Sequence, residues 1–300
     1  MQKNRKAIKP KITKNKLNFK NTVLNIIKYI KKSPELYKSF FGKNKNRKYK
    51  TKDLIECVLF LVKKNIIFRD TPYFFNHNYR NIHWGTIYKF YLKLIHHNII
   101  QNTYYETIKH YLKKSKNKIY LTDTTLILNK MGCESIGYNP QLLKHKTSKI
   151  SYITTCNGMP IDVSVTAGNH NDSKILYDQI NNDASNFHKI ITTNNKLLGD
   201  AGYDSEKIRI KLNEVNFGIL ICDRNKRNIK DAIKFKQLEL SETDKTLLKK
   251  RHKVENIFSH LKQFKRVQTR YDKKINNFYN CVLMASLMIA IKKTSRDNQY

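Results

Sequence analysis

The chain has 300 residues, and its 59 Lys and Arg outnumber its 23 Asp and Glu, giving a net charge of +36. Hydrophobic residues make up 40% of the chain, with only 9 Gly and 5 Pro, which excludes collagen-like, Pro-rich and wholly disordered classes. So large a positive charge on a folded chain attracts polyanions, and nucleic acid is the first partner to consider. Because most of the basic residues are Lys, A+T-rich coding is an alternative source of part of this charge.

The cysteines and the chain start bear on the compartment. The five cysteines are widely spaced and include no Cys-x-x-Cys pair, so neither a disulfide framework nor a zinc knuckle is expected. The first residues lack the apolar stretch of a secretion signal, and the longest apolar run, 281–291, is too short to span a bilayer. We expect a soluble cytoplasmic protein, associated with the nucleoid in a prokaryotic host.

Charge is unevenly distributed along the chain. Residues 1–50 contain almost only basic charges, with Glu35 as their single acid, whereas the acids concentrate in residues 116–230. This asymmetry predicts a flexible basic arm at 1–45, a small domain at 46–115 and a larger body at 116–300 whose carboxylates have a role.

The small domain is expected to be helical. Apolar residues recur at spacings of one, three and four over 54–62 and 84–95, Asp70-Thr71-Pro72 is typical of a helix start, and 103–114 predicts another short helix. Several short helices beside a basic arm indicate a helix-turn-helix type of DNA reader. A helical cap that packs on the body without touching DNA explains the pattern equally well.

From Ile119 onward the pattern alternates between strands and helices. Strands are expected at 119–128, 149–155, 161–166, 196–200 and 218–222, and helices at 173–182, from Asp204 or Ser205 to Val215, and at 250–266. The early strands follow one another closely enough to be antiparallel. The pattern predicts an α/β fold.

Two carboxylates fall at distinctive places in these strands. Asp123 lies within the first strand, where an unpaired buried charge is costly unless it binds cations. The alternative is a strand whose polar face meets water. Asp200 ends a strand and precedes a Gly turn, the position at which open α/β sheets place ligands, although a plain turn also explains it. For Asp204 a helix-capping role is the expectation.

A third acid, Glu255, lies on the helix expected near the C-terminus. At about 100° per residue, Arg251, Glu255 and Lys262 form one stripe beside the apolar face of that helix. If the apolar face packs on the sheet, Glu255 leans toward Asp123 and Asp200; the alternative is a solvated salt bridge. Three carboxylates suit Mg²⁺ or Mn²⁺, and two such ions about 4 Å apart can assist phosphoryl transfer.

With these motifs the chain resembles the DDE transposases of bacterial insertion sequences, most closely the IS5-like group of the IS4-like superfamily. The resemblance runs from about Lys43 to the C-terminus. The similar segments are Leu121–Thr125, Leu198–Asp204, the linking segments 146–150, 158–160 and 167–172, and Arg251-x₃-Glu255-x₆-Lys262. The last is similar to a signature of Tyr, Arg, Glu and Lys, with Leu248 in the place of the Tyr.

The resemblance implies a ribonuclease-H-like core with a mixed five-stranded sheet, whose three acids bind two Mg²⁺ or Mn²⁺ ions. It implies Asp123, Asp200 and Glu255 as catalytic metal ligands, and Arg251, Lys262, Tyr203 and Lys149 as DNA contacts. The implied activity is cleavage at the terminal inverted repeats of an insertion sequence and transfer of the freed 3′-hydroxyl to target DNA, by a homodimer and without a covalent link to protein. A nuclease of the same fold and a decayed or domesticated DNA-binding derivative are the alternatives.

Overall fold

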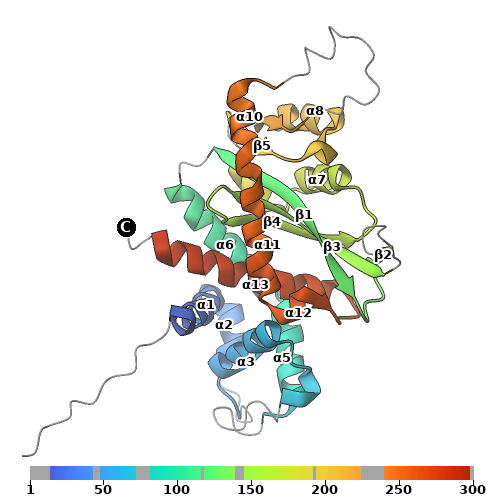
Figure 1. Ribbon diagram of the computed structural model, residues 1–300. Helices are drawn as coiled ribbons and strands as arrows, with labels where there is room; N and C mark the ends of the chain where they lie inside the picture. Colours follow the sequence, from blue (N-terminus) through green and yellow to red (C-terminus); the bar gives the residue numbers. More distant parts are fainter. Residues whose placement is uncertain are drawn as a thin grey trace, which may run out of the picture.

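The computed structural model describes residues 14–42, 48–71, 82–115, 118–138, 145–191, 194–223 and 240–297. Its centre is a mixed sheet with α-helices around it (Figure 1). The five main strands are β1 (Ile119–Asn129), β3 (Lys146–Thr155), β4 (Pro160–Ala167), β5 (Asn195–Leu198) and β6 (Gly218–Ile221).

The strands lie in the order β4-β3-β1-β5-β6. β3 is antiparallel to both β1 and β4, whereas β5 is parallel to both β1 and β6. This confirms the α/β class and the ribonuclease-H-like core with a mixed sheet. Two strands of two residues each, β2 (Gly137–Tyr138) and β7 (Thr269–Arg270), extend the expected five-stranded sheet to seven.

The helices of the body are α7 (Asp172–Asn181), α8 (Glu206–Glu214), α10 (Glu242–Leu248), α11 (Glu255–Lys262), α12 (Lys265–Gln268) and α13 (Ile275–Asp297), and α6 (Ile99–Lys114) directly precedes the first strand. Short 3₁₀ turns are η3 (Asn186–Ile190), η4 (Ala201–Tyr203) and η5 (Lys249–Val254). α13 is almost wholly buried between residues 281 and 291 and packs on α6, β4 and α11. Across the described ranges, no helix combines the length and the apolar character that crossing a membrane requires.

The continuous helix expected at 250–266 is interrupted. The chain runs as η5 into α11, and the two form one column in front of the sheet in Figure 1. Phe264 then adopts an extended conformation, which ends α11 before α12 begins. Phe264 and Val267 are both buried, so the apolar contacts of this segment with the core continue across the break.

The N-terminal region corrects the expectation of a flexible arm at 1–45. Residues within 14–41 form α1 (Lys14–Ile30) and α2 (Pro34–Phe41). Val23, Ile26 and Ile30 of α1 are fully buried, and this helix packs on α6 and α13. Their spacing of three and four residues places these side chains on one face of the helix, and the lysines of α1 occupy other positions. Residues 1–13 lie outside the described residues.

The other N-terminal elements are α3 (Thr51–Lys64), η1 (Phe68–Asp70) and α5 (Trp84–His96), followed by α6. The helices expected from apolar periodicity in this region are therefore present, and α6 begins four residues before the expected start at Thr103. The expected helix start at Asp70-Thr71-Pro72 lies at the edge of the described range, since residues 72–81 are outside it.

Candidate active site

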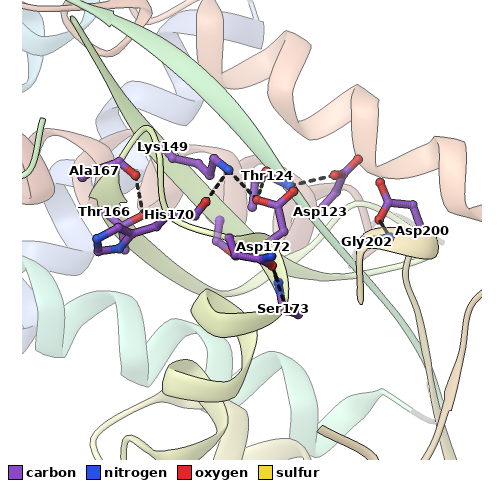
Figure 2. A network of polar contacts seen from close by, with 12 residues as sticks. Asp123, Thr124, Lys149, Thr166, Ala167, His170, Asp172, Ser173, Asp200 and Gly202 are labelled. Carbon is purple, nitrogen blue, oxygen red and sulfur yellow. Dashed lines mark hydrogen bonds and ion pairs between the residues drawn. The ribbon is translucent and has the colours of Figure 1, made fainter. Parts of the chain in front are cut away.

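Two of the three candidate acids lie on neighbouring strands, Asp123 within β1 and Asp200 just beyond the end of β5. β1 and β5 are parallel, with Leu121 opposite Leu198. Asp123 and Asp200 each follow two residues after these paired leucines. Strand pairing ends at Leu198, and the Asp200 side chain accepts a hydrogen bond of 2.8 Å from the Gly202 amide as η4 begins. Figure 2 shows the carboxyl groups of Asp123 and Asp200 beside one another.

The surroundings of the Asp123 carboxylate disfavour its ionised form. Its side chain is 18% exposed, and burial raises its pKa from the ordinary 3.8 to about 6. The Thr124 amide, which donates to Oδ1 at 2.8 Å, and the Arg251 guanidinium, 3.5 Å from Oδ2, lower this pKa, whereas Asp200 and Asp172 raise it further. The surrounding protein therefore supplies less positive charge than the ionised carboxylate needs, which favours binding of a cation.

The third acid lies in an adjoining depression. Glu255 is the first residue of α11, one helical turn after Arg251, and it is exposed. Together with Thr125 and Lys262 it lines an open depression of about 680 Å³. Thr125 is two residues beyond Asp123 on β1, so both project from the same face of the sheet. The depression is thus continuous with the Asp123 side of the strand.

The donor set fits a hard divalent cation in part. Asp123 and Asp200 offer only oxygen ligands, which Mg²⁺ and Mn²⁺ prefer, and the desolvated Asp123 carboxylate is short of positive charge. Over the ranges that the structure describes, however, no three side chains of His, Cys, Asp or Glu are close enough to hold one metal ion. The structure brings Asp123 and Asp200 together and leaves Glu255 apart, beside Thr125.

The Tyr203 ring is buried, so it is not placed to make the DNA contact that the resemblance implies. Its side chain is 0% exposed and packs against the backbone of Gly199, where an added Cβ would lie 2.9 Å from the ring. Burial raises the pKa of Tyr203 well above the usual range, and Asp172, Asp123 and Asp200 add to that rise. Tyr203 therefore belongs to the packed interior behind the acids.

Lys149 is likewise not available to a DNA phosphate. It is 7% exposed, and its Nζ donates to Asp172 Oδ1 at 2.6 Å and to the His170 carbonyl at 2.7 Å. The reason is its position on β3, which lies inside the sheet between β4 and β1. Of the four residues implied as DNA contacts, Arg251 and Lys262 remain accessible.

Asp172 is a member of the site that reasoning from the sequence missed. It is the first residue of α7, and its Oδ1 accepts hydrogen bonds from both Lys149 and Thr124 Oγ1, the latter at 3.0 Å (Figure 2). The available signal was its place at the end of the loop 167–172, one of the segments that carry the family resemblance. Of Asp204 and Ser205, the two expected starts of the next helix, Ser205 is the N-cap of α8, and Asp204 forms an ion pair of 3.0 Å with Arg209.

Comparisons with known proteins identify the family of the chain. The family described as Transposase DDE domain matches residues 129–289, a segment that begins after Asp123 and includes Asp200 and Glu255. No curated protein matches the chain by sequence. Among solved structures, a Mos1 transposase paired-end complex with the left transposon end is similar at 10% identity and a TM-score of 0.26, over 83% of this chain and 97% of that one.

A pre-cleavage Mos1 transpososome is similar at 8% identity and the same TM-score of 0.26, over 92% of this chain and 97% of that chain. TM-scores of 0.26 assign no role to any residue of this chain. The family match rests instead on sequence, and it spans more than half of the 300 residues. Taken with the mixed sheet and the neighbouring acids Asp123 and Asp200, it shows that the chain belongs to the transposase DDE domain family.

Proposed function

We propose that this protein is an active transposase, which cleaves DNA at the ends of an insertion sequence and joins the freed ends to target DNA. Asp123, Asp200 and Glu255 would hold two Mg²⁺ or Mn²⁺ ions. The observation that carries the proposal is the proximity of Asp123 on β1 to Asp200 at the end of β5, where burial and neighbouring acids raise the pKa of Asp123 to about 6. Such a carboxylate gains most from a bound cation.

Each residue of the site has a distinct part in this proposal. Bound divalent ions would lower the pKa of an attacking water or 3′-hydroxyl and stabilise the leaving oxygen. The Thr124 amide orients the Asp123 carboxylate, and the Arg251 guanidinium offsets part of its negative charge. Glu255 follows Arg251 by one turn and borders the same face of β1, so rotation of its exposed side chain would complete the set of three.

The DNA backbone would lie along the open depression beside Glu255. An open surface suits a polymer better than an enclosed pocket does, and Lys262 and Lys265 line this one. Lys262 and Arg251 would hold phosphates next to the reacting bond, since ammonium and guanidinium groups bind phosphate oxygens directly. The surplus of basic residues elsewhere would add sequence-independent, salt-sensitive affinity.

Recognition of the terminal inverted repeats is proposed for the helices within 46–115, and the chemistry for the body, 116–300. Two DNA ends must be brought together for transposition, so two copies of the chain would act on one pair of ends. α1, α3 and α6 all pack on α13, which would connect a DNA-reading region to the catalytic body through a shared apolar core.

The test is a cleavage and strand-transfer assay with the DNA that flanks the gene, in Mg²⁺ or Mn²⁺. Asp123→Ala, Asp200→Ala and Glu255→Ala are each expected to abolish cleavage and transfer while DNA binding persists. Asp178→Ala, an exposed acid on α7, is the matched control and should keep full activity. Cleavage without transfer would indicate a nuclease, and binding without metal-dependent chemistry a decayed derivative. Cleavage retained in any of the three variants would contradict the site.

A further inference from the structure

A buried ion pair lies behind Asp123, between elements that are distant in sequence. Lys149 comes from the middle of β3, and Asp172 from the N-terminal end of α7. Both side chains are largely buried, with 9% and 28% exposed, and the Lys149 Nζ is 2.6 Å from Asp172 Oδ1. The Lys149 Nζ also donates to the His170 carbonyl, and this second hydrogen bond fixes the loop that precedes α7.

The pair is connected to Asp123 through Thr124. In the β1–β3 register Thr124 lies opposite Ser151, two residues from Lys149, so Thr124 and Lys149 project from the same face of the sheet. The Thr124 hydroxyl donates to Asp172 Oδ1 at 3.0 Å, while its amide donates to Asp123 Oδ1 at 2.8 Å. One residue therefore makes hydrogen bonds both to the buried pair and to the catalytic carboxylate, as Figure 2 shows.

We propose that Lys149 and Asp172 are positioning residues for metal binding at Asp123. The pair anchors the Thr124 hydroxyl from behind the strand, and the Thr124 amide in turn fixes the orientation of the Asp123 carboxylate on the other face. Outer partners of metal-binding groups set the direction of those groups in this way. The inference rests on the proposed function, because it assumes that Asp123 binds a divalent ion.

Two simpler roles for Lys149 make different predictions. As a phosphate contact, Lys149→Gln would weaken DNA binding and lower the slope of log affinity against log salt by about 1. As a mere source of positive charge, its loss would strengthen cation binding, because a charge that repels the ion is removed. Positioning predicts the opposite sign: weaker binding of the ion, with DNA affinity unchanged.

The experiment measures Mn²⁺ binding to the full chain by calorimetry without DNA, and DNA cleavage separately. Thr124→Val removes the hydroxyl at nearly constant volume and charge, and it should raise the Mn²⁺ dissociation constant and lower the cleavage rate by about 10-fold or more. Thr124→Ser keeps the hydroxyl and should stay close to wild type. Lys149→Gln should weaken Mn²⁺ binding to a similar degree, whereas Lys174→Gln, an exposed lysine on α7, should not.

Unchanged Mn²⁺ affinity in Thr124→Val, or tighter binding in Lys149→Gln, would overturn the positioning role. If Lys149→Gln does not fold, Lys149→Arg replaces it, since an arginine keeps the charge and should retain at least part of the ion affinity, while Thr124→Val still decides. A wild-type chain that binds Mn²⁺ and does not cleave DNA would contradict the proposed function alone. The binding isotherms of the variants would then still test the positioning role.

Discussion

Replacing Asp123 by Asn should stabilise the metal-free protein at neutral pH. The ionised Asp123 carboxylate is largely buried, and Asp200 and Asp172 repel it, while Arg251 offsets this only in part. Asn keeps the shape of the side chain and the oxygen that accepts from the Thr124 amide. The substitution thus removes a charge that folding has to desolvate and leaves the local hydrogen bond in place.

The size of the effect follows from the pKa. A folded-state pKa of about 6 against an ordinary value of 3.8 means that the folded protein holds this proton more tightly than the unfolded chain does. Stability then falls as pH rises through this interval, by up to about 3 kcal/mol at 1.36 kcal/mol per pH unit. Asp123→Asn should match wild type near the lower pKa and exceed it by up to about 3 kcal/mol above the upper one.

Urea denaturation in a chelator, at several pH values from about 4 to 8, measures this difference. Asp178→Asn removes an exposed carboxylate and controls for the general loss of negative charge. Adding Mn²⁺ should reduce or reverse the advantage of Asp123→Asn, because an ion that binds the native wild type stabilises it. A variant no more stable than wild type at neutral pH, or a difference independent of pH, would refute the electrostatic reasoning.

Three further substitutions test the packing of the fold. Arg266 lies 2.7 Å from the buried Asp272 carboxylate, and Arg266→Met leaves that carboxylate without its partner. The free energy of unfolding, measured by urea denaturation, should fall by about 3–5 kcal/mol. Adding Asp272→Leu should recover most of this loss, and no recovery would argue against a charge effect. Leu261→Ala removes a fully buried side chain from α11 and should cost about 2–5 kcal/mol in thermal melts; a loss below about 1 kcal/mol would contradict the packing of that helix. In Gly218→Ala an alanine would have to adopt a φ of 120°, with its Cβ against the Asn195 carbonyl. The free energy of unfolding should therefore fall by more than about 1 kcal/mol. A neutral effect would contradict this backbone geometry.

Sequence patterns located most of the sheet and two of its acids. Short strand-like segments predicted each of the five main strands to within a few residues, and tight connections implied the antiparallel pairs. The parallel register of β1 and β5 then makes the proximity of Asp123 and Asp200 almost inevitable, because both acids come two residues after paired leucines. Such features depend on local periodicity, which a single sequence records well.

The misplaced residues depend on contacts between distant parts of the chain. The burial of Lys149 depends on Asp172, and nothing near Lys149 in the sequence indicates a buried partner 23 residues later. Tyr203 was implied as a DNA contact only by the family resemblance, and nothing in the local sequence shows that the turn η4 directs its ring inward. The burial of α1 was obscured by its many lysines, since composition outweighed the short apolar stripe that packs on α13.

The most direct measurement is anomalous X-ray scattering from Mn²⁺ in crystals of the protein bound to DNA that carries one terminal repeat. We expect two Mn²⁺ peaks, about 4 Å apart, ligated by Asp123, Asp200 and Glu255 and in contact with the phosphate at the cleavage position. Two peaks would also require the Glu255 side chain to have turned from the depression beside Thr125 toward Asp123. Mn²⁺ bound elsewhere, or a DNA phosphate seated away from these three carboxylates, would contradict the assignment of the active site.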